Sequence, residues 1–116
     1  MKKRDRVILY KISDEAKIIA NMLHDVDETA FLKNEEKMRA VCMTLVNIGE
    51  LIKNMTDEFR NNNRHIPWRD LAGLRDVTAH GYFTLRMSDI WIYAANELPE
   101  HAMKINEILT QPDDEN

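Results

Sequence analysis

The chain has 116 residues, enough for one domain with a hydrophobic core. Its 44% hydrophobic and 31% charged residues are ordinary for a globular protein, and only three Gly and three Pro favour helix over sheet. A net charge of −4 argues against broad, sequence-independent binding to nucleic acid. The single cysteine, Cys42, excludes an intrachain disulfide and a cysteine-based zinc site.

No apolar run approaches the roughly 20 residues that a membrane span needs. The basic N-terminus leads into an amphipathic segment, unlike the apolar core of a signal peptide. We therefore expect a cytoplasmic protein with no membrane contact, folded as one domain over residues 1–116. The acidic tail, residues 113–116, is expected to fray.

The first predicted helix spans residues 5–25. Apolar residues recur there at steps of three and four and form one apolar face. These residues are Ile8, Ile12, Ala16, Ile19 and Leu23. Polar residues interrupt the pattern over 25–29, and Phe31 and Leu32 can fix this connection onto the core.

The second predicted helix is the longest. Asn34 is a good N-cap, and Glu35 and Glu36 follow it in the first turn, where the helix dipole favours negative charge. Helical periodicity then continues for six turns to Phe59. The apolar positions are Met38, Val41, Cys42, Leu45, Ile48, Ile52, Met55 and Phe59.

Asn residues at 61–63 predict a break, because Asn favours turns. Pro67 suits the first position of a helix, so residues 67–72 predict a short helical turn ended by Gly73. A second short helix is expected over residues 74–80, with Gly81 as its C-terminal stop.

Ser88 is the expected N-cap of the last long helix, with Asp89 in its first turn. Pro99 should kink this helix near Ala95, since proline removes one backbone hydrogen bond. Its expected buried residues are Trp91, Ala95, Leu98, Ala102, Ile105 and Leu109. Because no segment alternates like a strand, the predicted fold class is all-α, with three long helices and a short helical insert before the last.

Positive charge is concentrated in one part of the chain. Arg60, Arg64, Arg69 and Arg75 fall within residues 60–75, opposed there only by Asp70. Any contact with RNA should therefore be local and depend on the shape of the site, and should not extend over a wide positively charged surface.

The stretch from Arg75 to Tyr82 is the most informative motif. Arg can hold a phosphate by two hydrogen bonds, His80 can move a proton near neutral pH, and Tyr82 offers a hydroxyl that can be modified. This set suits the handling of a phosphodiester without a metal. On an ideal helix, however, residues five apart are separated by roughly 140° and about 7.5 Å of rise.

That spacing leaves several interpretations open. Arg75 and His80 can meet one phosphate if the Arg75 side chain swings along the groove, if the short helix is distorted, or if a second subunit completes the site in a two-fold dimer. A purely structural interpretation pairs Arg75 with Asp70 or Asp76 at the surface and lets His80 cap a helix C-terminus.

Other candidate residues carry weaker signals. Gly49 in mid-helix costs roughly 1 kcal/mol against Ala, which suggests close approach of another segment beside Glu50. Glu50 is either a supporting site residue or a solvated carboxylate. The two tryptophans, at 68 and 91, and most of the seven methionines are expected in the core.

The remaining histidines are His24, His65 and His101, which we expect at the surface or in packing contacts. No two of them have the spacing of metal ligands with a carboxylate. We therefore expect no metal site and no cofactor.

The motif set resembles the HepT toxin family of HEPN-domain proteins. The resemblance rests on Arg75-x4-His80-x-Tyr82, on Ile66-Pro67-Trp68-Arg69 and on Ile48-Gly49-Glu50, and it extends to Gly81-Tyr82-Phe83, Trp91 and Leu98-Pro99. It spans nearly the whole chain, from Asp5 to about Leu109. The resemblance implies an HEPN-type up-and-down helical bundle that forms a homodimer with ribonuclease activity.

The resemblance also implies residue roles and a partner. Arg75 and His80 would be the catalytic pair, with Asp76 and Glu50 in support. A minimal nucleotidyltransferase antitoxin would transfer AMP from ATP to Tyr82, and the two proteins would form a hetero-oligomer. The chain departs from the family pattern at Asp76, where Asn is frequent, and at Arg86, where an acidic residue is usual.

Elementary chemistry agrees with a metal-independent endoribonuclease. RNA carries its own nucleophile, the 2′-hydroxyl, so cleavage needs a proton acceptor, a proton donor and charge stabilisation. Two alternatives remain: a non-catalytic module that binds a nucleotide, and a helical subunit that positions a nucleotidyltransferase on its substrate.

Overall fold

The computed structural model describes residues 1–72 and 82–112. All regular structure in these two ranges is helical, so the predicted all-α class is confirmed. The helix expected over residues 74–80, the stops at Gly73 and Gly81, and the fraying of residues 113–116 lie outside the described residues.

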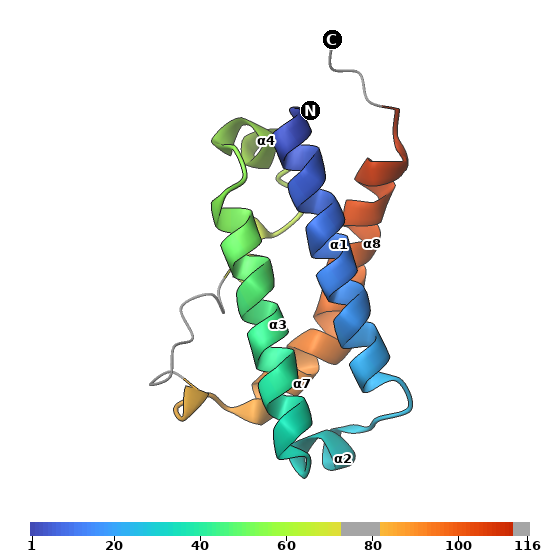
Figure 1. The fold of residues 1–116 in the computed structure, drawn as a ribbon, viewed down its shortest axis with the longest axis vertical. Coiled ribbons are helices and arrows are strands. Elements are labelled where there is room, and N and C mark those ends of the chain that lie inside the picture. The colour runs from blue at the N-terminus through green and yellow to red at the C-terminus, as the bar shows by residue number, and fades with distance from the viewer. Residues whose placement is uncertain (73–81, 113–116) are drawn as a thin grey trace.

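Three long helical rods form the bundle (Figure 1). They are α1 (Lys3–Leu23), α3 (Glu35–Lys53) and a continuous third rod that consists of α7 (Met87–Ile92), a π-helical turn η2 (Tyr93–Glu97) and α8 (Leu98–Thr110). α1 packs against both α3 and α8, which gives the up-and-down arrangement that the sequence predicts.

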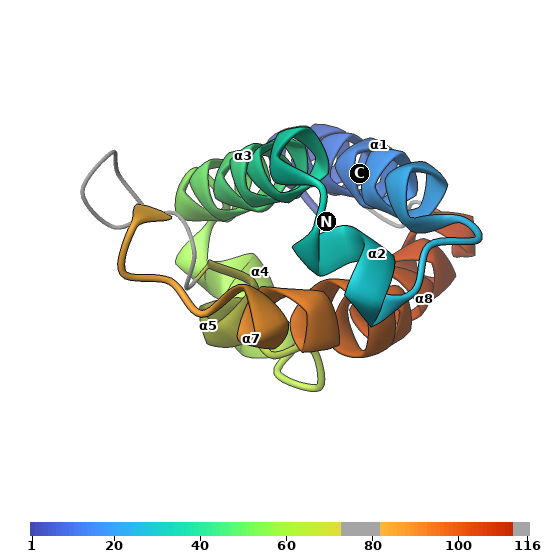
Figure 2. The ribbon, with the colours of Figure 1, turned by 90° about the horizontal axis from the view of Figure 1, so that it is seen from below.

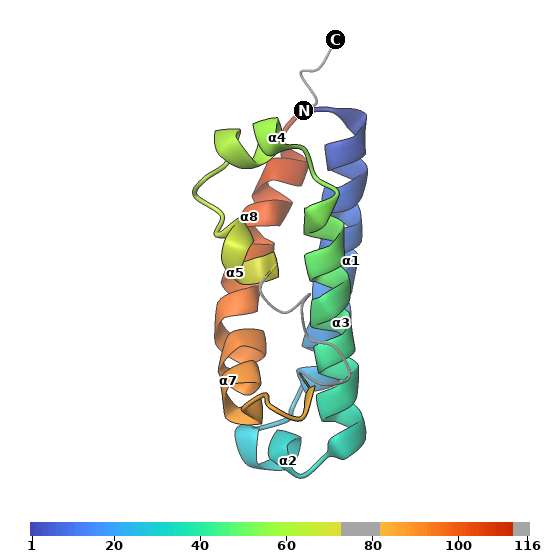
Figure 3. The ribbon, with the colours of Figure 1, turned by 90° about the vertical axis from the view of Figure 1, so that its left-hand side faces the viewer.

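Three short helices complete the described part of the fold: α2 (Glu28–Leu32), α4 (Asp57–Asn62) and α5 (Trp68–Ala72). Viewed along the bundle, α1 and α3 form one layer and α5, α7 and α8 the other, with α2 across one end (Figure 2). Figure 3 shows α4 and α5 one above the other at the end where α3 finishes. α5 packs against α3 and therefore links the two layers.

The core is one cluster of apolar side chains from both layers. Its fully buried members include Leu9, Ile12, Ile19, Phe31, Leu45, Ile48, Ile52, Ile66 and Ile105. Four of the five predicted apolar positions on α1 are buried, and Leu23 packs against the cluster from its edge. Trp68 is a core anchor as predicted, with its ring centroid 5.8 Å from that of Phe59, whereas Trp91 packs against the core from its edge, 5.4 Å from the Phe31 ring centroid.

The connection after α1 contains a helix that the sequence did not predict. The Asp27 side chain accepts a hydrogen bond from the Ala30 N–H at 2.8 Å and caps α2. Phe31 is fully buried, as expected, but Leu32 is 39% exposed, so its predicted role is wrong. A five-residue helix presents only one narrow face to the core, and Phe31 occupies it.

The long second helix is shorter than predicted. Asn34 is its N-cap, as expected, with Oδ1 accepting from the Lys37 N–H at 3.0 Å. α3 nevertheless ends at Lys53, and a separate helix, α4, begins at Asp57. Its N-cap Thr56 accepts a hydrogen bond from the Phe59 N–H at 3.1 Å, which a continuous helix would not allow.

Ser88 is not the N-cap of the last rod. α7 begins at Met87, with Arg86 in the capping position and no side-chain capping bond. The short stretch before it, residues 83–86, is exposed or partly buried, and its backbone sets the helix start without a capping hydroxyl.

Pro99 acts through a π-helical turn. Its missing N–H leaves the Ala95 carbonyl without the usual donor four residues on, and the Leu98 N–H instead reaches the Tyr93 carbonyl five residues back. The extra residue changes which positions face the core. Ala94 is buried instead of the predicted Ala95, while Leu98 and Ile105 are buried as predicted.

Three other predictions for this rod need adjustment. Trp91, Ala102 and Leu109 are only partly buried, and they pack against the edge of the core. Ile90, His101 and Ile108 are buried instead. Within the described ranges, no helix is both long enough and apolar enough to cross a membrane.

Candidate functional site

The predicted site residues fall into two groups. Arg75, Asp76 and His80 lie outside the described residues, so their convergence remains a prediction. Tyr82, Glu50 and the departure at Arg86 are described. The structure therefore defines the surroundings of the predicted modification site.

Tyr82 lies in a small polar cluster with two residues of α3. Its hydroxyl donates a hydrogen bond to Oε1 of Glu35 over 3.2 Å, across 47 positions of sequence. The Arg39 guanidinium lies 4.6 Å from the centroid of the Tyr82 ring, in cation–π geometry. Tyr82 thus contacts the first turns of α3 through both its hydroxyl and its ring.

The local structure of α3 explains why these two residues meet Tyr82. The cap at Asn34 starts the helix at Glu35, and Glu35 and Arg39, four residues apart, lie one turn apart on the same face. Arg39 Nε donates to the same Oε1 of Glu35 at 2.9 Å. That carboxylate oxygen accepts hydrogen bonds from both Arg39 and Tyr82.

The surroundings of Tyr82 favour the protonated form of its hydroxyl. Burial raises its pKa above the usual 10.0, the hydrogen bond and charge of Glu35 raise it further, and Arg39 opposes them. At neutral pH Tyr82 is therefore a neutral phenol that donates its proton to a carboxylate. To react as a nucleophile it would have to lose that proton to an acceptor, and Glu35 is in contact with it.

Phe83 extends this cluster to the surface. Phe83 is 78% exposed, and its ring meets the Tyr82 ring edge-on, with centroids 5.5 Å apart. An exposed aromatic ring beside a tyrosine hydroxyl offers an apolar contact for a planar ligand or a partner protein. Nearby Arg86 is also exposed, and its Nε lies 3.8 Å from Oδ2 of Asp89.

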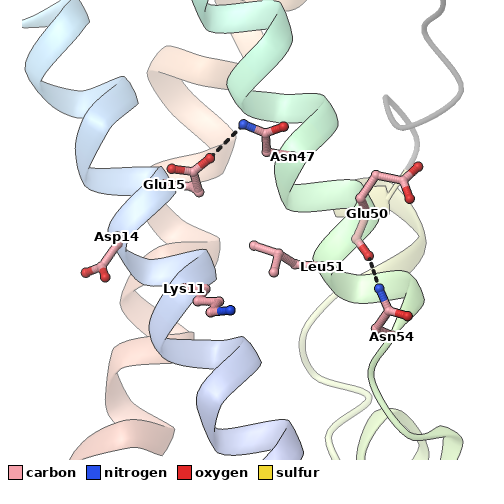
Figure 4. A pocket seen from close by; sticks show the side chains of 7 residues that line it. All are labelled: Lys11, Asp14, Glu15, Asn47, Glu50, Leu51 and Asn54. Carbon is pink, nitrogen blue, oxygen red and sulfur yellow. Dashed lines mark hydrogen bonds between the residues drawn. The ribbon is translucent and has the colours of Figure 1, made fainter.

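Glu50 borders a groove between α1 and α3 with a volume of about 490 Å³. Figure 4 shows Lys11, Asp14 and Glu15 on one wall and Asn47 and Glu50 on the other, with the Glu50 carboxylate turned away from α1.

The hydrogen bonds of the residues that line this groove do not involve the Glu50 carboxylate. Asn47 Nδ2 donates to Glu15 Oε1 at 2.9 Å, and the Glu50 backbone carbonyl accepts from Asn54 Nδ2 at 3.1 Å. Gly49 is buried, in keeping with close packing at that point, whereas Glu50 is exposed. A supporting role for Glu50 stays a prediction.

The three other histidines behave as expected. His24 is exposed beside Asp25, His65 is exposed, and His101 is buried with its Nδ1 3.2 Å from the Tyr93 hydroxyl. Burial and the neighbouring Lys104 lower the pKa of His101, so it is neutral in the core. In the two described ranges, no three His, Cys, Asp or Glu side chains are grouped so that they could hold a metal ion.

Fold and sequence together define an HEPN-like helical bundle. The family described as ribonuclease HepT-like matches residues 12–108, and the chain belongs to that family. The match begins within α1, covers α3 and nearly all of the third rod, and includes the segment that carries Arg75, His80 and Tyr82.

Named relatives agree with this assignment. A protein of Methanocaldococcus jannaschii named "Putative RNase" is 35% identical over all of this chain and 98% of its own length. A second of that name, from Caldanaerobacter subterraneus, is 33% identical over 92% of this chain and 96% of its own. The probable ribonuclease HepT of Thermococcus cleftensis is 28% identical over 85% and 90%, respectively. No solved structure matches the chain.

Sequence reasoning missed the partners of Tyr82. Glu35 and Arg39 have the spacing of an ordinary helix-surface ion pair, and the sequence around Glu35 indicates only a first-turn carboxylate. Nothing local in the sequence connects either residue with Tyr82. The contact arises because the chain around residue 82 lies beside the first turns of α3.

Proposed function

We propose that this protein is a metal-independent endoribonuclease that acts as the toxin of a toxin–antitoxin pair. Membership of the ribonuclease HepT-like family carries this proposal, because that family and its named relatives are described as ribonucleases. The chain also contains the residue types that RNA cleavage needs, at Arg75 and His80.

In the proposed reaction the RNA 2′-hydroxyl attacks the adjacent phosphorus. His80 accepts the proton of that hydroxyl, and the bond from phosphorus to the 5′-oxygen breaks. A second His80, from the other subunit of a homodimer, donates a proton to the leaving oxygen. Arg75 stabilises the negative charge that builds on the phosphoryl oxygens. Asp76 and Glu50 would support this site.

The spacing of Arg75 and His80 supports a proposed oligomeric state. Residues five apart on an ideal helix do not share a face, so a two-fold axis beside the motif would bring the Arg75 and His80 side chains of two subunits around one phosphate. We propose a homodimer of a single HEPN-like domain, acting in the cytoplasm.

The proposed regulation acts on Tyr82. A minimal nucleotidyltransferase antitoxin would transfer AMP from ATP to the Tyr82 hydroxyl, and the pair would form a hetero-oligomer. The modification adds a phosphate charge and an adenine two residues from His80. Repulsion of the RNA phosphates and occlusion would both stop cleavage. The exposed Phe83 ring beside Tyr82 supports this proposal because it offers an apolar contact to an incoming partner or an adenine.

The test of catalysis is cleavage of RNA by the purified protein in excess EDTA. Arg75→Ala and His80→Ala should each abolish cleavage, whereas Arg86→Ala and His65→Ala, which change exposed residues of the same types, should retain it. Loss of cleavage in EDTA would refute metal independence. An inactive wild-type protein that binds ATP or AMP in calorimetry would favour the nucleotide-binding alternative.

The test of regulation is growth of bacteria that express the toxin together with its antitoxin. Tyr82→Phe removes the acceptor hydroxyl and should leave the toxin active despite the antitoxin. Tyr93→Phe removes the hydroxyl of a partly buried tyrosine elsewhere and should be neutralised like the wild type. Equal rescue of Tyr82→Phe and wild type would refute modification at this residue.

A further inference from the structure

A second groove lies where α3 ends and the α4–α5 connection passes beside it, with a volume of about 650 Å³. Its inner surface includes the buried side chains of Ile66 and Trp68. Four cations also line it: Lys53, Arg60, Arg64 and Arg69. We call it the cationic groove.

The cationic groove differs in charge from the groove of Figure 4. No carboxylate is among the described residues that line it, whereas Lys11 shares the other groove with Asp14, Glu15 and Glu50. Four of the chain's 16 Lys and Arg residues therefore line one concave surface of a protein whose net charge is −4. Such a local concentration of like charge attracts polyanions.

The walls of the groove are held in place by contacts that do not depend on a ligand. Trp68 Nε1 donates to the Asn63 carbonyl at 3.1 Å, and Lys104 Nζ donates to the His65 carbonyl at 3.4 Å. These bonds anchor both sides of Arg64 in the connection before α5. Residues that are already held in place lose less conformational entropy on ligand binding than mobile residues do.

One of the four cations has a structural role. Arg60 pairs with Asp57, and its Nη1 donates to the Ile52 carbonyl at 3.5 Å, which ties α4 to the end of α3. Arg64, Arg69 and Lys53 are exposed. The guanidinium of Arg64 donates a hydrogen bond to a neutral acceptor, Oδ1 of Asn61, at 3.3 Å.

We propose that the cationic groove binds the sugar–phosphate backbone of a single-stranded RNA segment next to the bond that is cleaved. The proposal rests on the ribonuclease function proposed above. Three of the four cations are arginines, whose planar fork matches phosphate oxygens. Ala72 lines the groove, and Arg75 follows it by three residues, a span of at most about 11 Å along the chain.

The shape and lining of the groove define how the RNA is bound. A volume of about 650 Å³ accommodates a few nucleotides of one strand and is too small for a duplex. Trp68 is only 7% exposed, so it is not available to stack on a base. Contacts to phosphates without stacking position the RNA but carry no sequence information.

A neighbouring groove limits the path of the strand. Arg69 also borders this neighbour, whose lining includes Asp70, Asp89 and Glu97. These carboxylates repel phosphates, so the RNA stays on the side of Arg69 that faces Arg64.

The direct test measures binding of the wild-type protein to a single-stranded RNA whose 2′-hydroxyls are methylated, so that it keeps its phosphates but resists cleavage. The variant Arg64→Gln/Arg69→Gln should bind about tenfold more weakly. The slope of log K against log salt concentration should become shallower by about 1.4, because each lost phosphate contact removes about 0.7. Fluorescence anisotropy across a salt series gives both quantities.

The matched control is Lys11→Gln/Lys17→Gln, which removes the same charge from exposed positions of α1. It should keep the wild-type slope and lose less than about twofold in affinity. Equal effects of the two double variants would show a general charge effect and overturn the proposal. The proposal would also be overturned if Arg64→Gln/Arg69→Gln bound RNA as tightly as the wild type, or if no form of the protein bound RNA. An acidic protein would then be the remaining candidate ligand of the cationic groove.

A cleavage assay separates this proposal from the proposed catalysis. Arg64→Gln/Arg69→Gln should reduce kcat/KM about tenfold for an RNA of some 20 nucleotides and leave cleavage of a dinucleotide unchanged, since a dinucleotide does not extend into the groove. An equal reduction of kcat/KM for both substrates would refute the proposal that the cationic groove binds RNA. If no form cleaves RNA but the binding results are as expected, the proposed ribonuclease activity is refuted and RNA binding by the cationic groove is supported.

Discussion

The carboxylate of Asp5, near the start of α1, accepts two hydrogen bonds from Thr56, 51 positions later in the chain. The Thr56 N–H reaches Oδ1 at 2.9 Å and its hydroxyl reaches Oδ2 at 2.7 Å. The Asp5 residue is only 1% exposed. Because the Thr56 hydroxyl also caps α4, Asp5 helps to fix where α3 stops and α4 begins.

Removing this carboxylate should strongly destabilise the protein. Asp5→Ala deletes two hydrogen bonds to a charged acceptor and leaves two donors of Thr56 without it, so we expect a loss of about 3 kcal/mol in the free energy of unfolding. Urea denaturation followed by circular dichroism at 222 nm measures this directly.

Asp14→Ala is the matched control, because Asp14 is an exposed carboxylate of the same helix. Its effect should stay within about 0.5 kcal/mol. Thr56→Val, which removes the hydroxyl and keeps the N–H, should fall between the two. An Asp5→Ala protein as stable as Asp14→Ala would contradict the anchoring role of Asp5.

The helical periodicity of the chain predicts the three long rods. It does not predict the break between α3 and α4, because a residue far away in the sequence causes that break. The apolar pattern continues from Met38 to Phe59 because α3 and α4 bury the same kinds of side chain. They are separated by the hydrogen bonds that Thr56 donates to Asp5, together with the bond that Arg4 Nε donates to the Asn54 carbonyl at 2.7 Å. Such contacts depend on tertiary structure and leave no periodic signal.

The same limit applies to the site. Arg75, His80 and Tyr82 were predicted from residue type, spacing and resemblance, all of which are local properties of the sequence. Glu35 and Arg39 were not assigned to the site, because their relation to Tyr82 exists only once α3 has packed beside the motif. The π-helical turn before Pro99 likewise moved burial from Ala95 to Ala94, which a fixed helical period does not anticipate.

The hydrogen bond from Tyr82 to Glu35 should be measurable in the ionisation of the phenol. Glu35 raises the pKa of Tyr82 through this bond and through its charge, although burial is the larger cause. Glu35→Gln removes the charge, so the pKa of Tyr82 should fall toward its usual value while the contribution of burial remains. The measurement is the ultraviolet absorbance of phenolate during alkaline titration.

Tyr82→Phe supplies the reference spectrum that isolates this residue from the other two tyrosines. Glu36→Gln is the control, because Glu36 is an exposed carboxylate in the same helical turn and is not among the groups that shift the pKa of Tyr82. It should leave the titration unchanged. A pKa of Tyr82 that is equal in the Glu35→Gln and wild-type proteins would contradict the contact.

Cys42 should make the fold sensitive to alkali. It is buried near Met87, and burial raises the pKa of its thiol from 9.0 to about 11. Between these values the unfolded chain has lost the proton that the folded chain keeps, so the unfolded state binds fewer protons and stability falls as pH rises. We expect up to about 1.4 kcal/mol of this loss per pH unit to come from Cys42.

Cys42→Ala lacks this contribution and should lose less stability than the wild type between pH 8.5 and 10.5. The comparison uses the change with pH, measured by urea denaturation, so that any cavity left by the smaller side chain cancels. Parallel curves for the two proteins would show that the thiol does not titrate differently in the folded state.

His101 should have the opposite effect, at acid pH. Burial and Lys104 lower its pKa, although Glu97, Asp70 and Glu100 oppose them. As pH falls below the usual 6.5, the unfolded chain therefore binds a proton that the folded chain excludes, and stability is lost. Between pH 7.5 and 5.5, the wild type should lose up to about 1 kcal/mol more free energy of unfolding than His101→Gln, which cannot be protonated. His65→Gln, at an exposed position, should follow the wild type. If His101→Gln and wild type lose stability equally over this range, the buried imidazole is not the group that titrates.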